Sequence, residues 1–260
     1  MNRRDATLGL GAAGLLLAAG ERVTAQPVDP ARPAPSFAML VYPKMILLDL
    51  TGPLTVFNLT MGKTHLVWKD KNPVSTDVGI SVAPTTTFAE CPRDVDVLFV
   101  PGGLAGTTAL LDDSETLAFL SEMGARARFV TSVCTGSLAL GAAGLLTGRR
   151  ATSHWYTREL LPLFGATRSD ERVVEDGNLI TGGGVTAGID FGLTISARLR
   201  GEEWAKRTQL TLEYDPQPPF VGGSPAKAGP DATGAVLRAR SKAIAMAREA
   251  SERAAAKLRG

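Results

Sequence analysis

The chain has few of the side chains that bind metal ions or form covalent crosslinks. Its 260 residues include two cysteines, Cys91 and Cys134, and two histidines, His65 and His154. Zinc sites collect several cysteine or histidine ligands, often at short Cys-x-x-Cys spacing, and that spacing is missing here. Two cysteines are also too few for a disulfide framework. The sequence therefore predicts a protein without a bound metal.

Neither a strong charge imbalance nor a long apolar run is present. Lysine and arginine number 28 against 26 acidic residues, which predicts no nucleic-acid partner. Residues 226–260 carry 8 basic and 3 acidic side chains, and a solvated helical face accounts for this local excess. The apolar run Leu8–Ala19 is too short to cross a bilayer, so we expect no stable membrane span.

The N-terminus has the features of an export signal. Arg3 and Arg4 precede the apolar run, and small residues ending at Ala25 offer a cleavage site. This pattern resembles a twin-arginine signal covering residues 1–25, followed by a proline- and alanine-rich linker at 26–36. We expect the protein in the periplasm or outside the cell, or in the cytoplasm where the signal is not used.

Apolar runs alternate with helical patterns over residues 37–225, and residues 226–260 form an Ala/Arg-rich helical tail. This alternation predicts an α/β domain with a mostly parallel sheet and helices on both faces. The threonine-rich segment Val74–Ala89 is expected to form a β-hairpin. The predicted strands are Phe37–Tyr42, His65–Trp68, Val95–Val100, Phe129–Val133 and Leu179–Thr181; the predicted helices are Asp49–Thr60, Asp113–Ala125, Thr135–Leu146, Tyr156–Phe164 and Thr186–Leu199.

Cys134 stands between a predicted strand and a predicted helix. A β-branched run precedes it, and Gly136 lets the chain turn at once into a small-residue helical pattern. This pattern is typical of a nucleophile elbow, in which the side chain lies over a helix N-terminus that favours the thiolate. A buried cysteine acting as a small apolar residue is the alternative.

Glycine-rich loops follow three of the predicted strands. They are Pro101–Gly103, Cys134–Gly136 and Gly182–Gly184. In a doubly wound sheet the ligand binds beyond the carboxyl ends of the strands, so these loops would meet at one site. Each loop alone could be an ordinary turn, but their coincidence at strand ends predicts a functional site.

A series of motifs between Phe37 and Pro225 resembles the ThiJ/PfpI superfamily, and within it the isonitrile hydratases. The resemblance implies a flavodoxin-like doubly wound fold, related to class I glutamine amidotransferases, with a C-terminal helical extension. The residues that carry it are Leu48–Pro53, Pro101–Gly103, Thr131–Ser137, Gly141–Leu146, Arg149–Trp155, Asp176–Gly184, Thr186–Phe191 and Leu212–Phe220.

The resemblance also implies a reaction and its residues. It implies a lyase that hydrates an isonitrile, R–N≡C, to the N-substituted formamide, R–NH–CHO, as a homodimer without metal or organic cofactor. Cys134 would be the nucleophile, Asp49 the acid/base and Thr135 its neighbour in the pocket. Carried over in the same way, the substrate-binding residues would be Gly102, Gly103, Trp155 and Gly183, with the Gly103 N–H serving an anion hole.

Structural roles compete with some of these assignments. Asp49 precedes a Thr-Gly-Pro turn and could simply cap the helix predicted there. His154 follows a short predicted strand, so it is interpreted as a structural or supporting residue, and His65 as structural. Trp155 and Phe220 could line an apolar pocket or pack in the core.

Two other functions stay open. The first keeps the fold but is glyoxalase- or deglycase-like, or a peptidase. Peptidases of this superfamily commonly have histidine after the nucleophile, where Thr135 stands here, and the carbonyl-processing branches use glutamate where Asp49 stands. The second is a non-enzymatic ligand-binding regulatory module. Regulators of this type carry a helix-turn-helix domain after the sheet, and residues 226–260 fit a single helix better.

Overall fold

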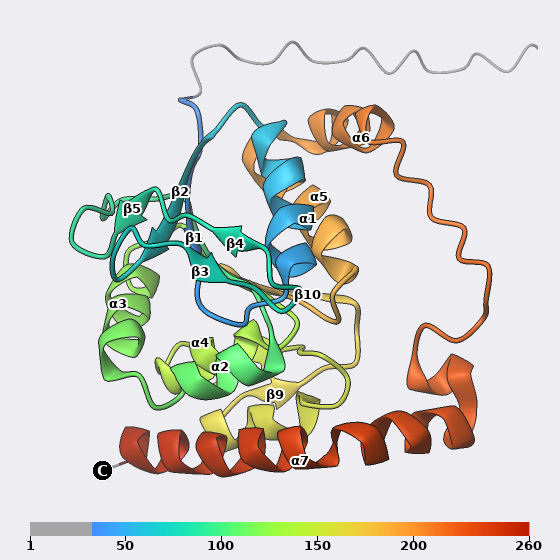
Figure 1. Ribbon diagram of the computed structural model, residues 1–260. Coiled ribbons are helices and arrows are strands. Elements are labelled where there is room, and N and C mark those ends of the chain that lie inside the picture. The colour runs from blue at the N-terminus through green and yellow to red at the C-terminus, as the bar shows by residue number, and fades with distance from the viewer. Residues whose placement is uncertain (1–32, 260) are drawn as a thin grey trace, which may run out of the picture.

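A computed structural model describes residues 33–259, so the predicted export signal and most of the predicted linker lie outside the described residues. A seven-stranded sheet forms the centre, in the order β10-β11-β7-β6-β1-β2-β5 (Figure 1). All neighbouring pairs are parallel except β10 with β11. The strands are β1 (Ser36–Leu40), β2 (Lys63–Trp68), β5 (Thr86–Thr87), β6 (Val97–Val100), β7 (Phe129–Val133), β10 (Val173–Asp176) and β11 (Leu179–Gly182).

Helices cover both faces of the sheet, so the predicted α/β architecture is confirmed. One face carries α1 (Leu47–Asn58) and α5 (Ala187–Arg200), with α6 (Glu202–Thr211) beside them (Figure 1). The other face carries α2 (Leu104–Leu110), α3 (Ser114–Gly124) and α4 (Gly136–Ala142). This is the flavodoxin-like arrangement, in which parallel strands are buried between two helical layers.

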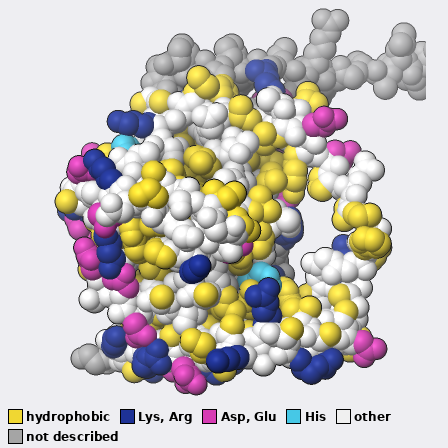
Figure 2. All heavy atoms as spheres, in the orientation of Figure 1, with side chains coloured by type: hydrophobic (Ala, Val, Ile, Leu, Met, Phe, Trp, Pro, Cys, Tyr) yellow, Lys and Arg dark blue, Asp and Glu magenta, His cyan; other side chains and the backbone are white. Residues whose placement is uncertain are grey.

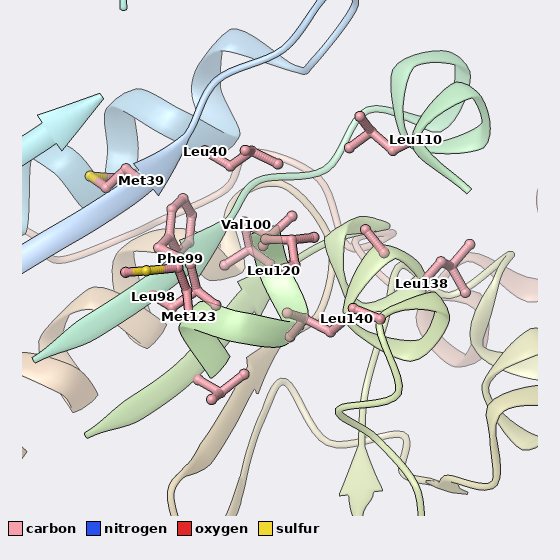
Figure 3. Close-up of a cluster of buried hydrophobic side chains, with 14 of the residues drawn as sticks. Met39, Leu40, Leu98, Phe99, Val100, Leu110, Leu120, Met123, Leu138 and Leu140 are labelled. Carbon is pink, nitrogen blue, oxygen red and sulfur yellow. The ribbon is translucent and has the colours of Figure 1, made fainter. Parts of the chain in front are cut away.

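The central strands of the sheet lie in an apolar core. The strands β1, β6 and β7 are almost wholly buried. Figure 3 shows side chains of β1 and β6 together with leucines of α2, α3 and α4. Each fully buried leucine or phenylalanine contributes about 1.5–3 kcal/mol relative to exposure, so this packing stabilises the sheet against the helices.

The five predicted strands are all present, whereas two of the predicted helices differ in extent. The third predicted helix is shorter, because α4 ends at Ala142 and the chain turns at Gly144, whose φ is 80°. The fourth is a 3-10 helix, η1 (Arg158–Phe164), and Pro162 inside it removes a donor that an α-helix would need.

The predicted hairpin is right in its first half and wrong beyond it. Strands β3 (Val74–Ser75) and β4 (Ser81–Val82) pair antiparallel. The following Thr86–Thr87 is instead β5, which pairs parallel with β2 at the edge of the main sheet. The alternating pattern continues through both segments, so it could not show where the hairpin ends.

The C-terminal helix α7 (Pro225–Arg259) lies along the lower edge of the domain, below α2, α4 and η1 (Figure 1). Its helical geometry is interrupted at Gly229. The arm between α6 and α7 runs outside the body of the protein (Figure 2), and Phe220 on it is 84% exposed. Within residues 33–259, no helix is long and apolar enough to cross a membrane.

Candidate active site

Cys134 occupies a strained turn at the carboxyl end of β7. Its φ is 54°, in the left-handed region that costs energy for a residue with a Cβ atom. Its N–H donates to the carbonyl oxygens of Gly182 and Gly183, at 3.1 and 2.6 Å, which holds the turn against the end of β11. The helix α4 begins two residues later. The structure therefore shows the predicted elbow geometry.

Asp49 lies in the first turn of α1 and is fully buried. Its Oδ2 accepts a hydrogen bond from the Gly102 N–H at 2.8 Å. Its Oδ1 has no hydrogen-bond partner among the described residues, and the Cys134 thiol interacts with this carboxyl. The N–H of Leu47 at the start of α1 donates to Asp77 Oδ1, so the cap comes from another segment. The interpretation of Asp49 as a cap for its own helix is wrong.

Gly102 is the contact point between Asp49 and the elbow. A Cβ atom at Gly102 would lie 2.6 Å from Asp49 Oδ2, from Cys134 Cβ and from Thr135 N. A side chain at this position would overlap atoms that cannot move without displacing the site. The close approach of three segments thus requires glycine here. It also shows that the loop after β6 lies directly against both candidate catalytic groups.

Burial changes the protonation of both groups. It raises the pKa of the Asp49 carboxyl to about 7, while the hydrogen bonds from Gly102 and Cys134 act in the opposite direction. Burial, and then the negative charge of Asp49, raise the pKa of the Cys134 thiol well above its usual range. The N–H of Thr135 lowers this pKa without offsetting the burial. The Thr135 N–H thus favours the thiolate, as expected at a helix N-terminus, whereas burial and the Asp49 charge oppose it.

Thr135 and Gly103 are joined by a hydrogen bond. The Gly103 N–H donates to Thr135 Oγ1 at 2.9 Å. This N–H is therefore already used, and the anion hole expected from it is not formed in this structure. Gly103 has a φ of 138°, and a Cβ atom there would lie 2.6 Å from the Lys44 carbonyl oxygen. Its role in this structure is to fix the Thr135 hydroxyl beside the thiol.

An aromatic cluster follows the short strand β8 (Arg150–Ala151), which pairs with β9 (Thr167–Arg168). The predicted pocket residue Trp155 is half-buried, and its ring centroid lies 5.5 Å from that of Tyr156. Burial, and then the negative charge of Cys134, raise the pKa of Tyr156 to about 12. Tyr156 therefore lies close enough to Cys134 for their charges to interact. Sequence reasoning missed it because it placed this residue at the start of a helix.

His154 packs against Tyr156 with its ring tilted by 39°. Its ring centroid lies 3.7 Å from that of Tyr156, and its Nδ1 has no hydrogen-bond partner among the described residues. Burial, and then the charge of Arg158, lower the pKa of His154 to about 4. A group this weakly basic is a poor proton acceptor at neutral pH. These contacts support the structural interpretation of His154.

The other residues considered in the sequence have structural roles or are exposed. Gly183 meets Cys134 through its carbonyl oxygen, while its own N–H donates to Arg172, so it contributes backbone support. His65 lies on β2, with Nδ1 3.3 Å from Thr86 Oγ1. The expected alternatives for Phe220, pocket lining or core packing, are both wrong within this chain because the ring is exposed. Over residues 33–259, no three metal-ligating side chains cluster together.

The order of the strands explains why these residues meet. β1 and its helix α1 continue to β2 on one side of the sheet, and β6 and β7 continue on the other. Ligands bind at such a switch in strand order, beyond the carboxyl ends. Asp49 follows β1, the two glycines follow β6 and Cys134 follows β7. The site is therefore built at the position that the topology favours.

The chain is similar to known proteins in sequence and in fold. A model of the DJ-1/PfpI family matches residues 36–198. The chain belongs to the DJ-1/PfpI family. It is 51% identical to an isonitrile hydratase of Pseudomonas putida over 220 residues, which cover 84% of this chain and 96% of the relative. It is 31% identical over 151 residues to the protein DJ-1alpha of Drosophila melanogaster, covering 57% of this chain and 70% of the relative.

A solved structure from the same family extends the comparison to the fold. The crystal structure of a ThiJ/PfpI family protein from Pseudomonas syringae matches with a TM-score of 0.83 and 47% identity. The match covers 88% of this chain and 98% of that protein. The fold and the family predicted from the sequence motifs are thus both confirmed.

Proposed function

We propose that this DJ-1/PfpI protein hydrates isonitriles to N-substituted formamides, with Cys134 as nucleophile and Asp49 as acid/base. The observation that carries the proposal is the buried contact between the Asp49 carboxyl and the Cys134 thiol at the elbow. One Asp49 oxygen has no other partner among the described residues, so the carboxyl can exchange a proton with the thiol. The similarity to an isonitrile hydratase along most of both chains supports the choice of substrate class.

The first step uses one proton held by the two side chains together. An isonitrile carbon has a lone pair and becomes electrophilic when it is protonated. Asp49 takes the thiol proton and transfers it to that carbon, while the sulfur of Cys134 forms a bond to the same carbon. The product is a thioimidate, R–N=CH–S–Cys134, and Asp49 is left as a carboxylate. A pKa of about 7 suits a group that must both accept and release a proton near neutral pH.

The second step consumes water. Asp49 removes a proton from a water molecule whose oxygen bonds to the thioimidate carbon, and this proton passes to the nitrogen. The carbon–sulfur bond then breaks, the formamide R–NH–CHO leaves, and the hydroxyl proton returns to the Cys134–Asp49 pair. One water molecule is added in total, and no oxidant or metal is consumed. Burial of the pair keeps other water away from the protonated carbon.

Turnover of a panel of aliphatic and aromatic isonitriles tests the reaction, with methylglyoxal offered beside them. We expect formamide to accumulate with at least one isonitrile, and Cys134→Ser to abolish its production. Cys91→Ser is the matched control, because Cys91 is the other buried cysteine and is not part of the site. Turnover of methylglyoxal alone would contradict the proposal and favour a carbonyl-processing enzyme.

We also propose that the protein acts as a homodimer after export. The exposed Phe220 and Val221 on the arm outside the body support a second copy as their partner, since large apolar side chains are seldom left in water together. Light scattering on the purified protein gives the mass of the assembly directly. A monomeric mass at micromolar concentration would contradict the dimer.

A further inference from the structure

The aromatic cluster of His154, Trp155 and Tyr156 covers one side of the elbow. Ser153, the residue before the cluster, donates its hydroxyl to the Cys134 carbonyl oxygen at 3.0 Å, which attaches this segment to the nucleophile. Cys134 itself is fully buried, whereas the three aromatic side chains are half-buried. We therefore expect a substrate to reach the sulfur past this cluster, with its R group left beside the rings.

One face of α7 is packed at its C-terminal end and open at its N-terminal end. Residues three or four apart share a helix face, and this face runs through Leu237, Arg240, Ile244, Ala247 and Ser251. Ser251 and Ala247 are fully buried, and Ile244 packs against the core while partly exposed. Arg240 and Leu237 are exposed. The first half of α7 therefore presents an arginine and apolar side chains on the side that faces the body.

Arg240 lies beside the aromatic cluster. After burial and the charge of Arg158, the charge of Arg240 is the next cause that lowers the pKa of His154, and it acts against burial in the pKa of Tyr156. The helix α7 contacts η1, which follows the cluster, and α4, which begins two residues after Cys134. Figure 2 shows a histidine with basic and apolar side chains around it, on the open surface above α7. Tyr156 is thus within interaction range of both the sulfur and the guanidinium.

The charge of Arg240 is not neutralised by a neighbouring acid. In the part of the chain that the structure describes, its guanidinium has neither an ion pair nor a hydrogen bond. Further along α7, in contrast, Arg253 pairs with Asp112 at 2.7 Å. Residues 225–246 carry four basic side chains and one acidic side chain, so this half of the helix has a positive excess. A guanidinium donates in a fork that matches a carboxylate, so an unpaired one beside aromatic rings suits an anionic group.

We infer that Arg240 is a specificity-determining residue that binds a carboxylate on the R group, so that the substrates are isonitriles with a carboxylate beyond an apolar spacer. This inference rests on the proposed function and names its substrate class. The isonitrile carbon lies at Cys134, the spacer lies along the aromatic cluster, and the carboxylate pairs with the guanidinium. Val236 and Leu237 are exposed apolar side chains on the same face as Arg240, and they contact the spacer. A neutral R group leaves the guanidinium without its charged hydrogen bonds.

The test compares two alkylating reagents that differ only in charge, N-(iodoacetyl)aminohexanoate and its methyl ester. Both attack the same sulfur, so the ratio of their rates at Cys134 cancels any change in the reactivity of the thiol itself. We expect the wild-type protein to prefer the acid, and Arg240→Gln to lower the acid-to-ester ratio on the order of 10-fold, as for one charged hydrogen bond. Arg240→Lys keeps the positive charge and should retain most of the preference.

Arg238→Gln is the matched control. It removes the same charge from the same helix, but a residue two positions away lies on nearly the opposite face. The Arg238 side chain also lies along its own helix, since Nη1 is 3.2 Å from where a Cβ atom of Gly234 would be. We expect this variant to keep the wild-type ratio at Cys134. An equal fall in both variants would reflect the net charge of α7 and would overturn the inference.

Turnover then measures the same preference with substrate. The kcat/KM for isocyanohexanoate relative to its methyl ester should fall in Arg240→Gln by about the same factor as the alkylation ratio. An acid-to-ester alkylation ratio that is equal in the wild type and in Arg240→Gln overturns the inference, even where both isonitriles are hydrated. The alkylation assay contains no isonitrile, so it decides the role of Arg240 even where the proposed hydration itself fails.

Discussion

Asp49 is the residue at which stability and function conflict most clearly. It is a buried carboxyl in an apolar domain, and only one of its oxygens accepts a backbone hydrogen bond. Its ionised form is costly there, because the low dielectric disfavours an uncompensated charge. A residue kept only for packing would be replaced by a neutral one. The conflict therefore supports a chemical role for this carboxyl.

We expect Asp49→Asn to lower turnover and raise stability. Asparagine can accept the Gly102 hydrogen bond, but it cannot accept and release a proton, so isonitrile hydration should fall on the order of 10²-fold or more. The raised pKa of about 7 means that the carboxyl favours folding below its unfolded pKa, and that this contribution is lost as pH rises through about 7. At about pH 8 the ionised group costs up to about 4 kcal/mol, which Asn removes.

Thermal unfolding at two pH values measures this effect. The gain in melting temperature for Asp49→Asn should be larger at about pH 8 than at about pH 5, where the folded carboxyl is already protonated. Asp70→Asn is a matched control, because Asp70 is exposed and its carboxylate accepts a hydrogen bond from the nearby Asn72 N–H. Near-wild-type hydration by the Asp49→Asn protein would refute the mechanism, whatever its stability.

The local residue pattern predicts some features of the site, and the other features depend on how the chain folds. The cysteine between a β-branched run and a small-residue helix indicated the elbow correctly. Its complete burial did not follow, because burial depends on the surrounding layers. Tyr156 was missed because no local pattern marks it.

At the scale of elements, α7 shows how a helix with a positive charge excess binds its own domain. A face of small residues, Ala247, Ala250 and Ala254, is buried against the body. Outside that face, Arg253 and Lys257 form ion pairs with Asp112, at side chains that are about half exposed. Small side chains let the helix approach closely, so the packing carries more of the docking energy than the exposed ion pairs do.

Two substitutions separate these contributions to docking. Ala250→Glu places a charge where no space exists, and we expect a loss on the order of 2–3 kcal/mol and faster proteolysis within α7. Arg253→Ala removes an exposed ion pair and should cost about 1 kcal/mol at most. Unfolding curves and limited trypsin digestion measure both. Equal effects from the two substitutions would show that charge, rather than packing, holds the helix.

The elements that sequence patterns missed have weak local signals. α2 is a short helix with two threonines and a glycine, all poor helix formers, and it packs against α7, α4 and α3. β10 carries two acidic residues and pairs antiparallel with β11. Asp113 caps α3, because its side chain accepts a hydrogen bond from the Thr116 N–H. Capping depends on neighbours in sequence, whereas an edge strand depends on its partner.

At the scale of the whole molecule, the N-terminal prediction concerns residues outside the described structure. We expect export to depend on Arg3 and Arg4, because the twin-arginine pathway reads that pair. Replacing both with lysine should leave unprocessed protein in the cytosol, as fractionation and N-terminal sequencing can show. Processing of the double variant at the wild-type rate would indicate a general secretion signal instead.

The sequence by itself determined the family, the alternation of strands and helices, and the three loops that form the site, because hydrophobic period and turn residues act locally. Tertiary structure alone decided the chemistry inside that site. It buried Asp49 against Cys134 and used the Gly103 N–H for Thr135. Proton positions depend on burial and on contacts between distant segments, and neither is defined until the sheet and its two helical layers have packed.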